Sequence, residues 1–265
     1  MSRPEARVQA TANGISIHYE SAGSGPPVVL IHALGLDWQQ WRDQIAALAP
    51  TRRAIALDLR GHGQSDRPPG PYSLGQMAED VYGLIEALGV APTDVVGLSL
   101  GGMVAMELAL RHPRAIRRLV LADTTSEYPR AAREQFEERA RTAETEGMAP
   151  LVAGVPERWF TPEFARAHPE TVAEIQRIVG ANDPAAYAAA CRAVGTVDCT
   201  SRLGSLACPT LVVVGDQDPG TPPAAARRLR EAIPGARLVV IDGASHLSNV
   251  GRPDAFNTAL LEFLA

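Results

Sequence analysis

The sequence feature that most constrains this fold is Gly97-Leu98-Ser99-Leu100-Gly101, a serine held between two glycines in the pattern Gly-x-Ser-x-Gly. The apolar run at residues 94–98 has the character of a buried strand, and residues 101–108 favour a helix. A serine at such a sharp strand-to-helix turn adopts a strained backbone conformation, and the two glycines relieve the crowding. The pattern therefore predicts that the Ser99 hydroxyl projects from the carboxyl edge of a sheet as a candidate nucleophile. The alternative is a chance match in a glycine-rich chain.

The rest of the chain predicts a sheet with helices between its strands. Strands are expected at residues 27–32, 53–58, 94–98, 116–123, 210–215 and 237–241, after a hairpin of residues 7–12 and 15–20 that turns at Asn13-Gly14. Helices are expected at residues 38–48, 73–88, 101–108, 224–233 and 253–264, the second with Ser73 as its N-cap. This alternation is typical of an α/β fold.

The alternation stops after Asp123. Residues 124–202 are rich in Ala, Glu and Arg, contain no convincing strand and are expected to form several helices. We therefore expect a core domain of residues 1–123 and 203–265 that is interrupted by a helical cap of residues 124–202. Because the strands on both sides of the insertion belong to one sheet, the cap should sit at its carboxyl edge, where ligands bind in open α/β folds.

A serine nucleophile needs a base within hydrogen-bond reach and a group that orients the base. His246 and Asp218 each follow a predicted strand, so both should lie at the same sheet edge as Ser99. Their order along the chain is serine, acid, histidine, which is one that such sites use. We assign Ser99 as nucleophile, His246 as base and Asp218 as the orienting acid. Asp216, which abuts the strand, is the alternative acid, one of the two aspartates is expected to cap the next helix, and an ordinary surface role is the alternative for His246.

A negatively charged oxygen that develops in the reaction needs two N–H donors. The backbone of Leu100 directly follows the nucleophile, and the backbone of Leu34 lies in the loop after the strand at residues 27–32. We assign both amides to this role. His32 is expected to shape the same loop, and Gly61-His62-Gly63-Gln64-Ser65 is expected to form a tight structural turn.

Charge and cysteine content exclude several classes of function. The net charge of −5 argues against nucleic acid or an anionic membrane as a partner. Cys191, Cys199 and Cys208 form no CxxC pair, and no glycine-rich phosphate-binding loop is present, so we expect neither metal nor cofactor. No apolar run approaches the roughly 20 residues of a membrane span, and the first residues resemble no secretory signal. We expect a cytoplasmic protein that acts on a small molecule.

The chain resembles the α/β-hydrolase superfamily over essentially its whole length. The resemblance rests on Asp58-x-Arg60-Gly61-His62-Gly63-x-Ser65 and on Gly97-Leu98-Ser99-Leu100-Gly101-Gly102. It implies the α/β-hydrolase fold, with a mostly parallel eight-stranded sheet flanked by helices and a helical cap insertion that shapes the substrate pocket.

A narrower resemblance is to the 3-oxoadipate enol-lactonases of aromatic catabolism. The segments that carry it are Pro68-Pro69-Gly70-Pro71-Tyr72, Gly147-Met148-Ala149, Arg158-Trp159-Phe160-Thr161-Pro162 with Phe164, Asn182-Asp183-Pro184 with Tyr187 and Cys191, Asp218-Pro219-Gly220-Thr221-Pro222-Pro223, and His246-Leu247-Ser248-Asn249. It implies hydrolysis of an enol-lactone to 3-oxoadipate through an acyl-enzyme on Ser99. One departure is His32-Ala33, where those lactonases often carry a polar Asn-Ser pair and esterases the form seen here.

An enol-lactone of this kind carries a free carboxylate, so the resemblance implies a cation in the pocket. Arg133, Arg158 and Arg192 of the cap are the candidates, because a guanidinium binds a carboxylate in two places. Trp159 is the candidate for a pocket wall. A solvated arginine and an aromatic of the cap core are the ordinary alternatives.

Three other functions fit the same residues. A broad carboxylesterase or another lactonase would use the same triad, as would a cofactor-free perhydrolase or haloperoxidase acting with peroxide. The third is a binding protein without enzymatic activity. Dehalogenases and epoxide hydrolases are disfavoured, because they carry an aspartate where Ser99 stands.

Overall fold

The computed structural model describes residues 8–265, and eight strands in this part of the chain form one sheet. Residues 1–7, which carry the expectation about a secretory signal and the first residue of the predicted hairpin, lie outside the described part. The strands are β1 (Gln9–Ala12), β2 (Ile15–Ala22), β3 (Pro27–Ile31), β4 (Arg53–Leu57), β5 (Thr93–Leu98), β6 (Ile116–Ala122), β7 (Thr210–Gly215) and β8 (Arg237–Ile241). Their order is β1-β2-β4-β3-β5-β6-β7-β8. The pairs β1–β2 and β2–β4 are antiparallel and all the others parallel, which confirms the predicted mostly parallel sheet.

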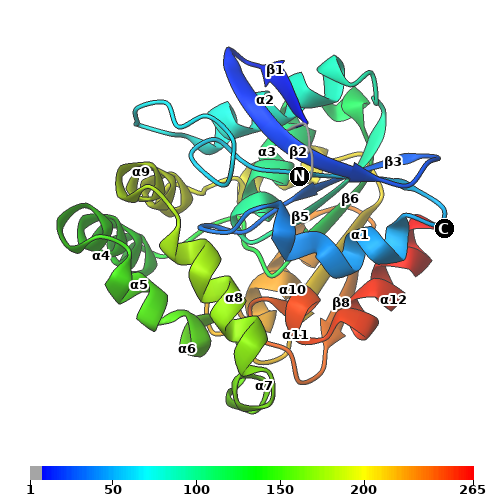
Figure 1. Cartoon of the computed structure of the whole chain (residues 1–265). Helices are drawn as coiled ribbons and strands as arrows, with labels where there is room; N and C mark the ends of the chain where they lie inside the picture. Colours follow the sequence, from blue (N-terminus) through cyan, green and yellow to red (C-terminus); the bar gives the residue numbers. More distant parts are fainter. Residues whose placement is uncertain (1–7) are drawn as a thin grey trace, which may run out of the picture.

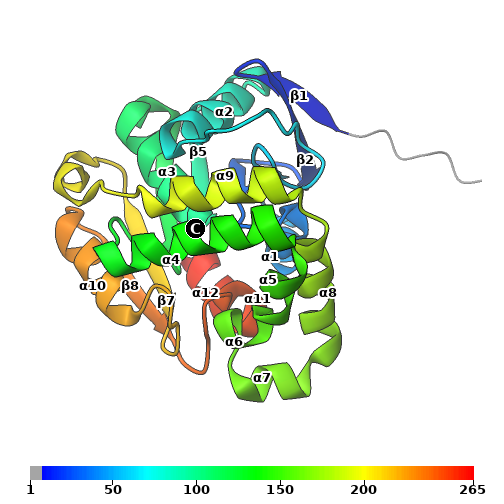
Figure 2. The ribbon, with the colours of Figure 1, turned by 90° about the vertical axis from the view of Figure 1, so that its left-hand side faces the viewer.

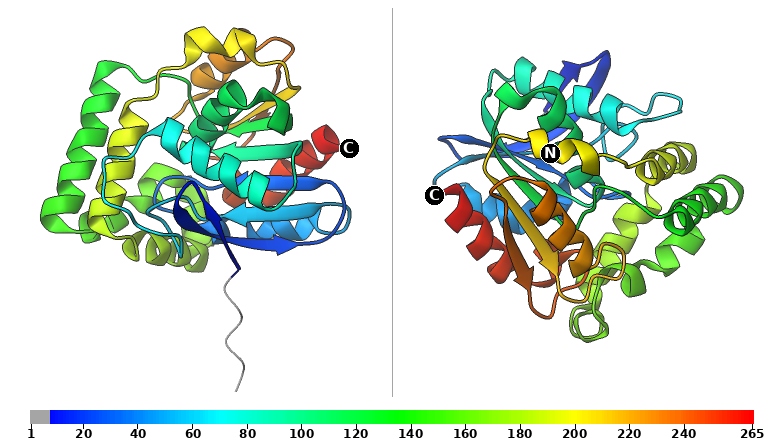
Figure 3. Two further views of the ribbon diagram at one scale, coloured as in Figure 1. Left: turned by 90° about the horizontal axis from the view of Figure 1, so that it is seen from above. Right: turned by 180° about the vertical axis from the view of Figure 1, so that it is seen from behind.

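Helices cover both faces of the sheet, which explains why its central strands are continuous apolar runs. Every residue of β5 and β7 is buried. Helices α1 (Arg42–Leu48) and α12 (Pro253–Leu264) pack together on the face toward the viewer in Figure 1. On the opposite face, in front in the right-hand view of Figure 3, lie α2 (Leu74–Ala87), α3 (Leu100–Arg111) and α10 (Pro223–Ala232).

Six helices connect β6 to the 3-10 helix η3 (Thr200–Ser205) and form the segment that we call the cap. They are α4 (Arg130–Glu146), α5 (Ala149–Ala153), α6 (Val155–Trp159), α7 (Pro162–Ala167), α8 (Pro169–Gly180) and α9 (Pro184–Gly195). The cap lies beside one end of the sheet in Figure 1, and Figure 2 shows α4 and α9 packed side by side. Proline at the start of a helix is favourable because its missing N–H has no partner there, and five of these helices begin in this way.

Side-chain caps explain where some of the helices begin. Ser73 caps α2 as expected, with its side chain accepting a hydrogen bond from the Gln76 amide. The predicted helix at residues 38–48 instead begins with a 3-10 turn, η1 (Trp38–Trp41), whose N-cap Asp37 accepts a hydrogen bond from the Gln39 amide. The expectation that Asp216 or Asp218 caps the next helix is wrong, because α10 begins after Pro222 without any side-chain cap. Among residues 8–265, no helix has the length and apolar character of a membrane span.

Candidate active site

Ser99 occupies the turn between β5 and α3 in a conformation that only its glycine neighbours permit. Its φ is +55° and its ψ is −115°, which is strained for a residue with a side chain. A Cβ atom at Gly97 would lie 2.2 Å from the Gly101 carbonyl oxygen, and one at Gly101 would lie 2.0 Å from the Ile31 carbonyl oxygen. Both glycines are therefore required for the turn to form, which accounts physically for the Gly-x-Ser-x-Gly pattern.

The structure brings Ser99, His246 and Asp218 into one hydrogen-bonded chain. Oγ of Ser99 lies 2.9 Å from Nε2 of His246, and Nδ1 of His246 lies 2.8 Å from Oδ2 of Asp218. All three side chains are buried and come from the loops after β5, β8 and β7. With the Nδ1 proton donated to Asp218, Nε2 is free to accept the proton of the serine hydroxyl. This is the arrangement that a serine nucleophile requires.

Asp218 is held in its charged form by its surroundings. Burial opposes the charge, but His246 and hydrogen bonds from Thr221 outweigh it and bring the pKa of Asp218 to about 2. The Thr221 hydroxyl donates at 2.6 Å, and the amides of Gly220 and Thr221 donate at 2.8 and 3.0 Å. Burial lowers the pKa of His246, but the charges of Asp218 and Asp123 outweigh it, so the pKa rises above its ordinary value.

The alternative acid, Asp216, has different surroundings. It is exposed, and its carboxylate accepts a hydrogen bond from the Ala244 amide at 3.2 Å. No hydrogen bond within the described residues joins it to His246. The geometry therefore favours Asp218 as the partner of the imidazole.

The two amides assigned to stabilise a negative oxygen are both available. Leu34 and Leu100 are buried, and neither backbone N–H donates a hydrogen bond to any residue of the described part. The loop that carries Leu34 is held in place from the cap, where the Asn182 amide donates to the Gly35 carbonyl at 2.8 Å. His32 secures the same loop, since its Nε2 accepts from the Leu59 amide at 2.9 Å.

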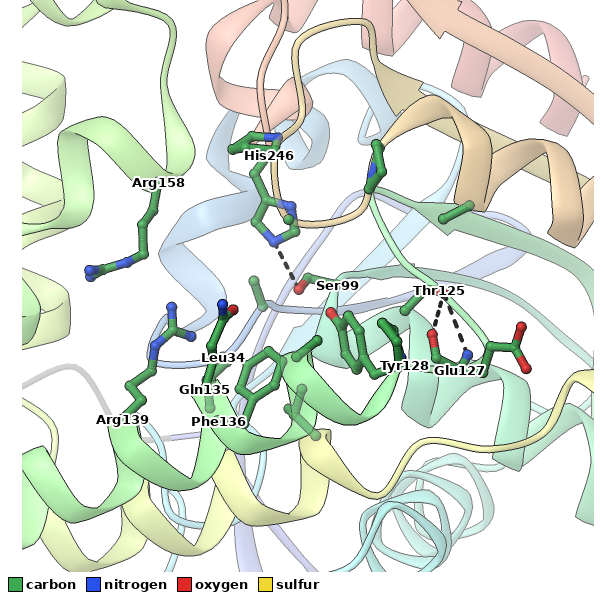
Figure 4. A pocket seen from close by; sticks show the side chains of 18 of the residues that line it. Leu34, Ser99, Thr125, Glu127, Tyr128, Gln135, Phe136, Arg139, Arg158 and His246 are labelled. Atoms are coloured by element: carbon green, nitrogen blue, oxygen red, sulfur yellow. Dashed lines mark hydrogen bonds between the residues drawn. The ribbon is translucent and has the colours of Figure 1, made fainter.

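A cavity of about 470 Å³ lies over this group, between the sheet edge and the cap. Its walls combine apolar side chains with a few polar ones, as ligand sites commonly do. Ser99 and His246 lie in its wall with Leu34, Tyr128 and Phe136 (Figure 4). Trp159 of α6 also lines it. Trp159 is also tied to the histidine loop, since its carbonyl accepts from the Leu247 amide at 3.2 Å.

Three arginines line this cavity, Arg139, Arg158 and Arg228, and of these Arg158 was predicted from the sequence. Arg228 lies 4.0 Å from the carboxylate of Glu127, which also lines the cavity, so Arg139 and Arg158 are the two without a carboxylate partner in the described chain. Arg158 of α6 and Arg139 of α4 both line it, with their guanidinium groups on one side and Ser99 and His246 across from them (Figure 4). Arg158 donates to the Leu151 carbonyl, and its Nε atom is buried without a partner within the described residues. Arg139 lies over the Phe136 ring, 5.3 Å from its centroid. Neither arginine forms an ion pair with another residue in the described chain.

Arg133 and Arg192 lie outside the cavity wall. Arg192 forms ion pairs with Glu137 and Glu144 at 3.0 and 2.6 Å on the exposed surface of α4 and α9. Arg133 donates to the Tyr128 carbonyl at 2.9 Å. Neither arginine therefore lines the cavity in which a substrate carboxylate would be bound. The signal that could have found Arg139 is a stripe at helical spacing, Ala132, Gln135, Phe136 and Arg139, all of which line the cavity.

The described residues contain no group of three or more His, Cys, Asp or Glu side chains arranged to hold a metal ion. Cys191, Cys199 and Cys208 are free thiols. The turn at Gly61–Ser65 is structural as expected, because Asp58 anchors it by accepting from the Gln64 amide at 2.8 Å.

Comparisons with known proteins agree with this architecture. A family model described as the alpha/beta hydrolase fold matches residues 26–253. The curated 3-oxoadipate enol-lactonase 2 of Acinetobacter baylyi is 32% identical over 252 residues, which cover 94% of this chain and 93% of the relative. The solved enol-lactonase of Burkholderia xenovorans is 37% identical, with a TM-score of 0.93 over 97% of this chain and 99% of that one.

A third relative has a different name. The solved thermophilic esterase of Thermogutta terrifontis, with malate bound, is 32% identical and has a TM-score of 0.92 over 98% of both chains. The matches extend over nearly the whole chain and confirm the resemblance that the motifs indicated. This protein therefore belongs to the α/β hydrolase family.

Proposed function

We propose that this protein is a serine hydrolase of carboxylic esters or lactones and that its substrate is 3-oxoadipate enol-lactone. The observation that carries the proposal is the hydrogen-bonded chain Ser99–His246–Asp218 in the wall of a cavity that two uncompensated arginines share. The names of the enol-lactonase relatives support the choice of substrate.

The reaction begins with attack of the Ser99 oxygen on the lactone carbonyl while Nε2 of His246 takes the hydroxyl proton. Asp218 stabilises the imidazolium through the Nδ1 hydrogen bond. The amides of Leu34 and Leu100 donate to the negative carbonyl oxygen. The carbon–oxygen bond of the ring then breaks, and the leaving enol oxygen takes the proton from His246. The product is an acyl-enzyme whose acyl chain carries the enol, and this enol becomes a ketone.

The second half of the reaction repeats the first with water as the nucleophile. His246 removes a proton from water as it attacks the acyl-enzyme, and returns that proton to Ser99 as the ester bond breaks. The new carboxylate leaves with the product, and the enzyme regains its starting state. One hydroxyl and one imidazole therefore suffice for both steps.

Arg139 and Arg158 support a substrate that carries a carboxylate away from the reacting ester. Two cations that face one cavity without a carboxylate partner favour the binding of an anion there, and a guanidinium can hold a carboxylate with two parallel hydrogen bonds. The cavity of about 470 Å³ suits a ligand of this size. Malate, which the related esterase binds, is itself a small dicarboxylate.

The test is steady-state hydrolysis of freshly generated 3-oxoadipate enol-lactone beside p-nitrophenyl acetate, with Ser99→Ala as the control. We expect kcat/KM for the lactone above about 10⁵ M⁻¹s⁻¹, within the usual enzyme range, and far above the value for the neutral ester. Comparable low values on both substrates would retain the serine mechanism and refute the lactone. No activity of any kind on esters or lactones would refute both.

A broad carboxylesterase is the second candidate, and one sequence observation favours it. His32-Ala33 stands where enol-lactonases often carry a polar pair, which leaves the loop beside Leu34 in the esterase form. An esterase would turn over uncharged esters better than the lactone, so the same two substrates separate the candidates.

A further inference from the structure

A third buried carboxylate, Asp123, lies beside the triad without belonging to it. It directly follows β6 and has a φ of +43°, a left-handed conformation that residues with side chains rarely adopt. Its side chain is fully buried. Its own amide continues the sheet by donating to the Val213 carbonyl at 2.9 Å. In this strained conformation the side chain of Asp123 forms a hydrogen bond with Gly215, the last residue of the neighbouring strand β7.

The Asp123 carboxylate accepts three hydrogen bonds from two different loops. Oδ1 accepts from the amide of Gly215 at 2.9 Å. Oδ2 accepts from the amide of Ser248 at 3.2 Å and from its hydroxyl at 2.5 Å. Gly215 ends β7, and Ser248 begins the short helix α11 (Ser248–Gly251).

These two partners flank the residues that form the triad. Gly215 lies three positions before Asp218, and Ser248 lies two positions after His246. A single carboxylate therefore connects the loop that carries the acid to the loop that carries the base. The loops also meet directly, where the Gln217 amide donates to the Ala244 carbonyl at 2.9 Å. Asp123 connects both loops to the end of β6, the strand that pairs with β5, after which Ser99 lies.

Burying a carboxylate in a left-handed conformation at this position destabilises the fold, whereas a neutral side chain could link the same two segments at a smaller free-energy cost. A buried charge is poorly solvated, and a left-handed residue is strained. Burial and the neighbouring Asp218 together raise the pKa of Asp123 to about 7. Placing a second carboxylate near His246 supports the imidazolium, while Arg139 of the cap acts in the opposite direction.

We propose that Asp123 is a positioning residue that sets the acid loop against the histidine loop and so aligns Asp218 with His246. The inference rests on the proposed serine mechanism and is independent of which ester or lactone is the substrate. Asp123 acts through the hydrogen bonds to Gly215 and Ser248. Where it is ionised, its charge adds to that of Asp218 when His246 becomes an imidazolium. Asp218 and His246 are the ionisable groups that act on Asp123 most strongly through their charges.

The test compares Asp123→Asn with wild type by the rate at which a fluorophosphonate labels Ser99. Asparagine keeps the size of the side chain and one acceptor oxygen but removes the charge and the second acceptor. We expect labelling to slow about tenfold or more, the loss of a hydrogen bond to a charged group. In substrate kinetics kcat should fall by a similar factor with KM changed less than about twofold. The acid limb of the pH profile should move to lower pH, because Asp123 is partly ionised near its pKa of about 7 and asparagine removes that negative charge from beside the imidazolium.

Ser248→Ala removes one hydrogen bond and leaves the charge. It should slow labelling by about threefold, a smaller loss than that of the charged acceptor, without moving the pH profile. Asp242→Asn is the matched control, because Asp242 is an exposed carboxylate after β8 whose side chain forms no hydrogen bond within the described residues, and it should stay within about twofold of wild type. If Asp123→Asn does not fold by circular dichroism, Ser248→Ala decides the question.

The outcomes separate this inference from the function on which it rests. Wild-type labelling rates and pH profiles in Asp123→Asn, or a wild-type rate in Ser248→Ala, overturn the positioning role and leave the serine mechanism standing. A wild-type enzyme that does not react with the fluorophosphonate overturns both. Labelling that slows as expected, in an enzyme that does not hydrolyse the lactone, supports the inference and refutes only the substrate.

Discussion

Burial and the charge of Arg139 both lower the pKa of Arg158, whose side chain lines the same cavity. The two guanidinium groups repel each other, and neither forms an ion pair with a carboxylate of the described chain, since Glu127 of the same cavity wall pairs with Arg228. A bound anion would relieve that repulsion and gain hydrogen bonds from both groups. We therefore expect the cavity to favour a negatively charged substrate.

Replacing either arginine by glutamine should weaken binding of the charged lactone. We expect Arg139→Gln and Arg158→Gln each to raise KM for 3-oxoadipate enol-lactone by about tenfold or more, the loss of a charge-assisted hydrogen bond. The kcat/KM for p-nitrophenyl acetate, which has no carboxylate, should change less than about threefold. Arg192→Gln is the control, because that guanidinium already pairs with Glu137 and Glu144 on the surface. An equal loss on both substrates would contradict an anion subsite.

Removing the nucleophile should eliminate turnover while leaving the fold intact. The Ser99 hydroxyl makes its one side-chain hydrogen bond to His246 within the described chain, so Ser99→Ala should unfold at nearly the wild-type temperature. Hydrolysis and covalent labelling by a fluorophosphonate should both disappear. Substantial turnover in a correctly folded Ser99→Ala protein would refute the covalent mechanism, since no other residue is assigned to attack the carbonyl.

The two aspartates after β7 should differ greatly in their contribution to activity. Asp218→Asn should lower kcat by about 10⁴-fold, because an amide oxygen neither orients the neutral imidazole correctly nor stabilises its charged form. Asp216→Asn removes an exposed acceptor of a 3.2 Å hydrogen bond and should stay near wild type. The comparison is made as kcat on one ester with both variants. The reverse order of effects would reassign the acid to Asp216.

Most strands of the sheet could be predicted from the sequence, because buried parallel strands are short, continuous apolar runs. The expected bounds of β7 and β8 agree with the structure, and those of β3, β4 and β6 differ by one residue. The order of the strands in the sheet could not be predicted from the sequence, because it depends on which strands pair after long connections. The loops of Ser99, Asp218 and His246 followed from their positions at strand ends, which parallel strands bring to one edge.

The cap arginines show where reasoning from sequence stops. Arg139 and Arg192 both lie on helices rich in charge, and composition does not distinguish them. Arg192 points to the outer surface of α9, where it meets two glutamates of α4. Arg139 lies on the face of α4 that contains Phe136 and turns toward the cavity. Which face of a helix covers the sheet is decided by the packing of the whole cap.

The pH dependence of activity should be governed by His246. Burial lowers the pKa of this imidazole, but Asp218 and Asp123 outweigh burial, so its pKa lies above the ordinary value of 6.5. Catalysis requires the neutral ring, so kcat/KM should rise with pH through a single step whose midpoint lies above 6.5. The measurement is kcat/KM on an uncharged ester from pH 5 to 9, corrected for spontaneous hydrolysis.

In the same experiment Arg139→Gln should move the midpoint to higher pH, because it removes a positive charge that opposes the imidazolium. A midpoint below 6.5 would mean that burial outweighs the carboxylates, and that Asp218 supports the charged ring less than its 2.8 Å hydrogen bond implies.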